Sequence, residues 1–236
     1  MTEKYGIDIS YHQGTIDWEQ VKKSGIQFVI MRAGYANTID AKFTEYARNC
    51  TRLDIPFGVY WFSYALNEDM ARKEARTCLG TIAPWKLSYP VCFDFEYASV
   101  DYAKKNGVNL TSDQIAKIAK AFLEEIEKSG YYAMNYTNRD FLSKGYSKLT
   151  GRFDTWYARW TDLPSPDFDC GIWQYSSTGK IPGISTQVDL DVAYKDYPAI
   201  ITIKKEDYKE EQENKETIKK LIQNIRANLN DLEKLI

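Results

Sequence analysis

Two acidic residues, Asp94 and Glu96, end an otherwise apolar run that begins at Pro90. On a strand, both side chains would point to the same face, with α-carbons about 6.6 Å apart at ~3.3 Å per residue. Two carboxyl groups placed together beside apolar and aromatic neighbours repel each other. This repulsion raises the proton affinity of one of them and leaves an acid and a base at neutral pH. Cleavage of a glycosidic bond needs that combination, so we predict a catalytic pair.

Two other acids, Asp8 and Asp189, also lie at or near the ends of apolar runs. A single acid there can simply cap a loop, but burial of the unpaired Asp94 and Glu96 without a function would cost too much free energy. Aromatic residues are frequent near the same strand ends, and sugar rings commonly stack on such side chains, although many of these aromatics could equally belong to the core. The candidates for substrate binding among them are Tyr35, Tyr60, Phe62, Tyr136 and Trp160.

Other chemistries lack their residues. His12 is the only histidine, so neither a metal site nor a Ser or Cys nucleophile with its base is expected. The segment after the first predicted strand has no Gly-rich phosphate turn, so we expect no nucleotide and no other cofactor.

The elements that must position these acids alternate along the first 200 residues. Helical patterns occupy residues 17–23, 41–53, 69–82 and 112–128, between β-rich runs at 5–9, 27–32, 56–62, 89–95, 131–136, 155–160, 171–175 and 187–190. Such alternation predicts parallel strands with right-handed crossovers, and eight strands in this length favour a closed barrel. Chemistry in such a barrel lies at the carboxyl ends of the strands. We predict an α/β fold, an irregular TIM-like barrel, with the irregular side after Tyr136, where the helices shorten.

Composition and net charge limit the classes of binding partner that we expect. The net charge is −2 and hydrophobic residues make up 44% of the chain, which predicts a globular protein and argues against a nucleic-acid binder. No apolar run approaches the roughly 20 residues that cross a bilayer, so no membrane insertion is expected. The first residues show no export leader, which predicts synthesis in the cytoplasm without a signal peptide. The four cysteines are scattered, which favours reduced core thiols without excluding a disulfide.

The composition changes near residue 203, which predicts a catalytic domain over 1–203 and a charged helical tail over 204–236. Ile218, Ile222, Ile225, Leu229, Leu232 and Ile236 follow at spacings of 4, 3, 4, 3 and 4, a heptad pattern on one side of a helix. This apolar seam of residues 218–236 is short. Two alternatives therefore stay open: self-association, for instance a homodimer through 218–236, or packing of the tail onto its own domain.

Ordered motifs along residues 4–197 resemble glycoside hydrolase family 25, the Chalaropsis-type lysozymes found among bacterial autolysins and phage endolysins. The motifs include YGIDISYHQG at 5–14, FVIMRAGY at 28–35, DFE at 94–96, WYARW at 156–160, IWQYSS at 172–177 and VDLD at 188–191.

The resemblance implies an irregular β/α barrel that hydrolyses the β-1,4 bond between N-acetylmuramic acid and N-acetylglucosamine in peptidoglycan, at the bacterial cell wall. It implies that Glu96 is the general acid, that Asp94 steadies the substrate's 2-acetamido group or the developing charge on the ring, and that Asp8 and Asp189 shape the site. It implies that the acetamido group attacks in place of a protein nucleophile, and it adds Gln174 to the substrate-binding residues. Asp191 shares a face with Asp189, which we prefer on motif position.

A barrel that binds cell-wall glycan without cutting it, and is oligomerised by its tail, is the alternative function. The presence of both Asp94 and Glu96 favours the enzyme, because a pure binding protein has no use for a buried proton donor.

Overall fold

The computed structural model describes the backbone of residues 3–233 and the side chains as far as residue 226. Eight strands form a closed barrel in the order β1-β9-β8-β7-β6-β5-β4-β2, and pairing of β2 with β1 completes the ring. This confirms the predicted barrel. The strands are β1 (Lys4–Ile9), β2 (Phe28–Tyr35), β4 (Phe57–Phe62), β5 (Val91–Asp94), β6 (Ala133–Asn138), β7 (Asp154–Ala158), β8 (Ile172–Gly179) and β9 (Val188–Ala193), and β3 (Thr38–Ile39) pairs with the end of β2.

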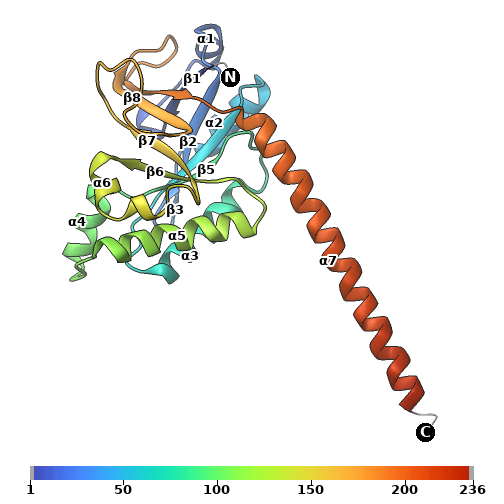
Figure 1. Cartoon of the computed structure of the whole chain (residues 1–236). Coiled ribbons are helices and arrows are strands. Elements are labelled where there is room, and N and C mark those ends of the chain that lie inside the picture. Colours follow the sequence, from blue (N-terminus) through green and yellow to red (C-terminus); the bar gives the residue numbers. More distant parts are fainter. Residues whose placement is uncertain (1–2, 234–236) are drawn as a thin grey trace.

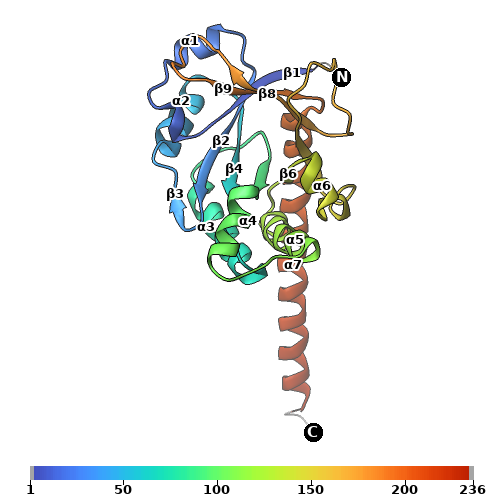
Figure 2. The same cartoon turned by 90° about the vertical axis from the view of Figure 1, so that its left-hand side faces the viewer.

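Helices cover the outside of the barrel along the first two thirds of the chain (Figures 1 and 2). The four predicted helices are present, and α5 begins with a capping box at Thr111. Two further short helices, α4 and α6, were not predicted. The helices are α1 (Trp18–Lys23), α2 (Phe43–Arg52), α3 (Glu68–Ile82), α4 (Tyr97–Lys105), α5 (Ser112–Lys128), α6 (Arg139–Ser143) and α7 (Tyr197–Glu233), with 3-10 turns η1 (Tyr11–Gln13) and η2 (Tyr146–Lys148).

One part of the predicted topology is wrong. Within the barrel itself, which excludes β3, every neighbouring pair from β1 through β8 is parallel, but β9 runs antiparallel to both β8 and β1. The reason is the connection: a loop at residues 180–187, without a helix, returns the chain directly from β8 to β9. Antiparallel strands need only a short connection, whereas a parallel strand requires a long crossover.

Alternation of side chains divides the core into two layers. Outward-facing strand residues such as Val29 and Phe93 pack against the helices in the larger hydrophobic cluster. Inward-facing residues such as Phe28, Cys92 and Trp156 fill the barrel. Toward the carboxyl ends of the strands, the inward-facing residues become polar, because the interior of the barrel meets the solvent there. All four cysteines are buried free thiols.

Helix α7 begins at Tyr197, before the predicted boundary near residue 203. Tyr197 and Ile201 are buried with the inner barrel cluster, and contacts with the barrel domain continue to Tyr208, whose hydroxyl donates to the Lys128 carbonyl at 3.1 Å. The ring of Tyr208 lies over Gly130, where a β-carbon would be 2.7 Å from it. The first three turns of the helix therefore belong to the barrel domain.

Beyond Tyr208, α7 projects away from the barrel (Figure 1). Its apolar side chains there are 45–57% exposed, and they include Ile218, Leu221, Ile222 and Ile225. This segment does not fold back onto the barrel. Of the predicted seam, the side chains of Leu229 and Leu232 and the whole of Ile236 lie outside the described residues. None of the described helices combines the length and the apolar character that crossing a membrane requires.

Candidate active site

The carboxyl ends of the barrel strands surround an open cavity of about 830 Å³. Its wall contains all four predicted acids, Asp8, Asp94, Glu96 and Asp189. The strands β1, β5 and β9 supply three of them, and Glu96 stands at the start of α4. The fold thus brings together side chains that are up to 181 positions apart in the sequence.

Asp94 and Glu96 form the first carboxyl pair of the site. Asp94 is the last residue of β5 and is 5% exposed, whereas Glu96 is the N-cap of α4 and is less deeply buried. Oδ1 of Asp94 accepts no hydrogen bond from an N–H or O–H group of the described residues. The charge of the adjacent Glu96 carboxyl acts on Asp94, which makes the two acids one titrating pair.

Asp8 and Asp191 form the second carboxyl pair, beneath Asp189. The Gln174 amide donates to Asp8 at 2.7 Å, and the indole N–H of Trp156 donates to Asp191 at 2.8 Å. Asp191 is fully buried and is not part of the cavity wall, while Asp189, two residues earlier on β9, lines the cavity. Alternation puts both on the inner face, and depth in the barrel separates them.

Burial raises the pKa of each of these acids. Burial, and secondly the charge of the neighbouring Glu96 carboxyl, keep the pKa of Asp94 well above its usual range. Burial and the charge of Asp189 raise the pKa of Glu96, against hydrogen bonds with Asp94 and the Tyr136 hydroxyl. Burial raises the pKa of Asp189 to about 6. Burial and then the charge of Asp191 raise the pKa of Asp8. Burial and the closeness of like charges therefore favour the protonated form of these carboxyl groups over the ionised form, compared with acids in water.

Arg32 brings a positive charge to this acidic site. It lies at the inner face of β2, where its charge opposes the rise in the pKa of Asp94. Its Nε donates to Asp40 at 2.8 Å, and the rings of Tyr11 and Tyr35 lie 4.9 and 5.1 Å from the guanidinium carbon. The ion pair with the buried Asp40 fixes the guanidinium in place.

Gln174 organises one wall of the cavity. Its Oε1 accepts from the Tyr136 hydroxyl and from the Trp160 indole, both at 3.1 Å, while its amide donates to Asp8. These three bonds determine which way the amide faces. Trp160 is 59% exposed at the rim, so its ring face is free to contact a ligand.

Five of the six predicted substrate-binding residues line the cavity, namely Tyr60, Phe62, Tyr136, Trp160 and Gln174. Tyr35 does not. It lines a separate hollow with Tyr64 and Tyr102. A register shift between Arg32 and Gly34 alters the pairing of β2 with β4 near the end of the strand, so the position of Tyr35 could not be read from simple alternation.

Several other residues of the cavity wall were not predicted from the sequence. Arg32 ends the apolar run at 28–31, so the strand-end criterion applied to cations would have found it. Asn138 is the last residue of β6, Arg139 and Asp140 follow it, and Arg159 follows β7, in positions equivalent to those used for the acids. Among the described residues, no three His, Cys, Asp or Glu side chains are arranged as a metal site.

The family model "Glycosyl hydrolases family 25" matches residues 7–184. The chain is 25% identical over 189 residues to the autolytic lysozyme of Clostridium acetobutylicum, covering 79% of this chain and 54% of that protein. It is 23% identical over 209 residues to lysozyme M1 of Streptomyces globisporus, covering 78% of this chain and 65% of that protein. The chain thus spans between half and two thirds of the length of these two curated relatives.

Solved structures share the fold. The modular autolysin LytC of Streptococcus pneumoniae, in complex with a synthetic peptidoglycan ligand, superimposes with a TM-score of 0.71 at 28% identity, over 81% of this chain and 47% of that one. A family 25 glycosyl hydrolase from Bacillus anthracis superimposes with a TM-score of 0.69 at 22% identity, over 81% of this chain and 89% of that one.

Proposed function

The chain belongs to glycosyl hydrolase family 25, and we propose that it is a peptidoglycan hydrolase acting on the bacterial cell wall. The bond cleaved is the β-1,4 linkage between N-acetylmuramic acid and N-acetylglucosamine. The observation that carries this proposal is the Asp94–Glu96 carboxyl pair at the wall of an open cavity bordered by aromatic side chains. The names of the relatives, which are lysozymes and autolysins, agree with it.

In the proposed reaction Glu96 is the general acid. Its carboxyl proton passes to the glycosidic oxygen while the bond from that oxygen to C1 breaks. The carbonyl oxygen of the substrate's own 2-acetamido group bonds to C1 and forms a cyclic oxazolinium ion, so no protein nucleophile is needed. Water then attacks C1, the bond from C1 to the acetamido oxygen breaks, and the Glu96 carboxylate takes the proton of that water. The anomeric configuration is retained, and the carboxyl separation is not a guide in such substrate-assisted enzymes.

The two carboxyls of the pair divide their roles by burial. Asp94 is deeper, and an N–H of the substrate acetamido group that donates to it would stabilise its ionised form. The proton retained by the pair then lies on Glu96, which is closer to solvent and to the leaving oxygen. Asp8 and Asp189 shape the pocket, with Asp8 held by Gln174. Tyr60, Phe62, Tyr136 and Trp160 offer surfaces for sugar rings.

Mass spectrometry of digested peptidoglycan tests the reaction class. A muramidase leaves N-acetylmuramic acid at the new reducing ends, a glucosaminidase leaves N-acetylglucosamine, and an amidase leaves the glycan strands intact. Glu96→Gln tests the alternative, a barrel that only binds glycan. In an enzyme this variant should lose cleavage, whereas a protein that only binds glycan has no cleavage to lose and should keep its affinity.

The projecting part of α7 supports a second proposal, that the chain self-associates through residues 218–236. The described part of this seam is exposed and lies away from the barrel, and soluble monomers seldom leave such an apolar stripe uncovered. The heptad spacing suits a second copy of the same helix.

A further inference from the structure

Glu74 is a buried acid that the proposed mechanism does not use. It lies in the middle of α3, on the face that also buries Ala71, Ala75 and Cys78, and it is 3% exposed. Burial raises its pKa to about 7, against the opposing effect of the Ser63 hydroxyl and the Tyr64 N–H. Burial of a carboxyl group costs free energy unless hydrogen bonds or ion pairs compensate for the lost water.

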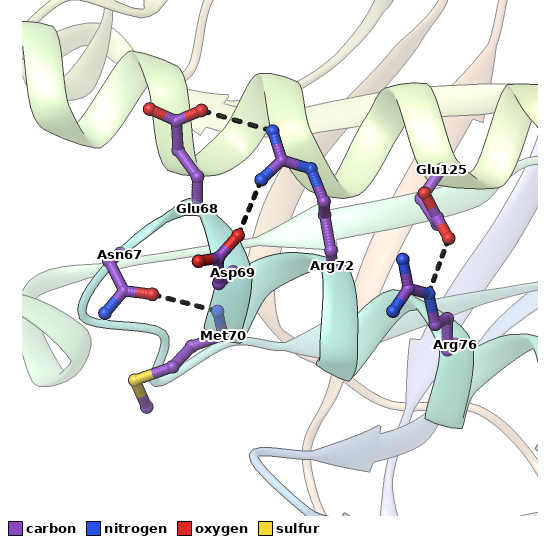
Figure 3. A network of polar contacts seen from close by, with 7 residues as sticks. All are labelled: Asn67, Glu68, Asp69, Met70, Arg72, Arg76 and Glu125. Atoms are coloured by element: carbon purple, nitrogen blue, oxygen red, sulfur yellow. Dashed lines mark hydrogen bonds and ion pairs between the residues drawn. The ribbon is translucent and has the colours of Figure 1, made fainter.

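The two arginines nearest to Glu74 on the helix, Arg72 and Arg76, are paired with other acids. Arg72 binds Glu68 and Asp69 at the start of α3, and Arg76 binds Glu125 of α5 at 2.7 Å (Figure 3). Asn67 caps the helix by accepting from the Met70 N–H. In the part of the chain that the structure describes, no cation forms an ion pair with Glu74. The helix is thus held in place independently, and the Glu74 carboxyl is left to act on the loop that it faces.

That loop joins the end of β4 to the start of α3, and it lies beside the end of β5. Glu74 Oε1 accepts from the Tyr64 N–H at 3.1 Å. The preceding residue, Ser63, is fully buried, and its N–H donates to the carbonyl of Asp94 at 2.7 Å. Glu74 therefore holds the Ser63–Tyr64 segment, and this segment aligns the end of β4 with the end of β5.

The same loop also reaches Glu96. The hydroxyl of Ser99 donates to the Ser63 carbonyl at 2.7 Å and accepts from the Glu96 N–H at 3.2 Å. Ser99 is 1% exposed. Ser63 is thus bonded directly to the backbone of Asp94 and, through one side chain, to the backbone of Glu96.

We propose that Glu74 is a positioning residue for the Asp94–Glu96 pair, acting through the Ser63–Tyr64 segment. The inference rests on the proposed function for its consequence in catalysis, and on the hydrogen bonds alone for its effect on geometry. A displacement of the two carboxyls by a fraction of an ångström changes both how they share a proton and how Glu96 meets the leaving oxygen.

Substitutions at Glu74 separate positioning from simple packing. Glu74→Gln keeps an oxygen that accepts from Tyr64, whereas Glu74→Met has a similar length and leaves that N–H without an acceptor. Cys78→Ala is the matched control, because Cys78 is fully buried one turn further along the same face and forms no hydrogen bond with Ser63 or Tyr64 among the described residues. It should lower the stability without affecting the acids.

The kinetic test compares these variants on peptidoglycan, per folded protein. We expect Glu74→Met to lower kcat between about 10- and 100-fold with KM within about twofold, and Glu74→Gln and Cys78→Ala to stay within about threefold of the parent. Equal kcat in Glu74→Met and the parent, or an equal loss in Cys78→Ala, overturns the proposal.

A second measurement does not need activity. The side-chain carboxyl carbons of Asp94 and Glu96, followed by NMR titration of the whole chain, should show midpoints that move by about half a pH unit or more in Glu74→Met and not in Glu74→Gln. Unchanged midpoints overturn the proposal. If the parent fails to cleave peptidoglycan, the proposed function fails while the titration still decides the role of Glu74. Should Glu74→Met not fold, Ser99→Ala tests the same link, and an unchanged Glu96 midpoint in that variant overturns it.

Discussion

Asp8 on β1 lies directly opposite Asp189 on β9 in the antiparallel register, and Gly6 lies opposite Asp191 two residues along. Acids therefore meet across one strand pair with no side chain between them. Like charges in facing positions destabilise a sheet, and burial strengthens the effect. The antiparallel return of β9 thus places acids together at a cost in stability.

Asp189→Asn should stabilise the protein at neutral pH. The pKa of Asp189 is raised to about 6 in the folded chain, so its protonated form favours folding, and this contribution is present below its ordinary value and is lost as the pH rises through about 6. We expect the free energy of unfolding at pH 7.5 to rise by about 1 to 2 kcal/mol, and the gain to vanish near pH 4. Urea unfolding at both pH values checks this, and an equal gain at both would contradict it.

Glu96→Gln should keep the fold and abolish most of the lytic activity, because it removes the proton for the leaving oxygen while preserving shape. General acid catalysis is typically worth ~10² to 10⁴-fold, so we expect a loss in that range. Loss of turbidity of a peptidoglycan suspension is the measurement. Glu45→Gln, at an exposed position on α2, is the control. Activity of Glu96→Gln within about threefold of the parent would refute its role as the acid.

Activity should fall on the alkaline side of its optimum as the Asp94–Glu96 pair loses its last proton. Both pKa values are raised, so the fall should begin well above the usual range of a carboxyl group. The dependence of kcat on pH measures this, and a flat profile up to pH 9 would argue against a carboxylic acid donor.

Asp94→Asn should also lower kcat by about 10²-fold or more, because the amide cannot stabilise developing positive charge as a carboxylate does. Its KM should change little. A variant whose kcat equals that of the parent would exclude Asp94 from the chemical step.

Trp160→Ala should weaken substrate binding more than chemistry. The ring is exposed at the rim, and its indole N–H anchors it to Gln174. We expect KM to rise about tenfold, the value of one stacking contact, with kcat within about threefold. Trp85→Ala is unsuitable as a control because Trp85 packs in the core, so Trp160→Phe, which keeps the stacking face, serves instead. A larger loss in kcat than in KM would place Trp160 in the chemical step.

The strand ends were predictable because an acid that ends an apolar run is rare and costly. Asp8, Asp94 and Asp189 all came from that criterion, and the structure places them in one cavity. Period-two alternation also put Asp189 and Asp191 on one face, but it carries no information on depth, so it could not tell the half-buried acid of the cavity wall from the fully buried one.

The remaining features depend on contacts between distant segments. The direction of β9 follows from the loop at residues 180–187, which contains the turn dipeptide Pro182–Gly183 and is too short for a helical crossover, whereas the prediction rested on the alternation of strands and helices earlier in the chain. Glu74 reads in the sequence as an ordinary polar residue of an amphipathic helix, and its burial becomes visible only when the loop after β4 is placed over it. Arg32 also ends an apolar run, as the acids do, so its position at the cavity could have been predicted in the same way.

Two truncations decide the role of α7. A chain ending at Glu216 keeps the contacts up to Tyr208 and loses the heptad seam, whereas a chain ending at Ile203 also loses the bond from the Lys205 ammonium to the Leu87 carbonyl at 2.9 Å and the packing of Tyr208 on Gly130. If the seam pairs with a second copy, light scattering should report a dimer or larger assembly for the whole chain and a monomer for the chain ending at Glu216, with equal stability of the two barrels. The chain ending at Ile203 should be less stable by about 1 to 3 kcal/mol, since it leaves a buried carbonyl without its donor.

Two catalytic domains joined by one stalk would stay longer on an insoluble, repetitive wall, because the second domain binds at a high effective concentration once the first is bound. A monomeric whole chain at tens of micromolar would rule this out.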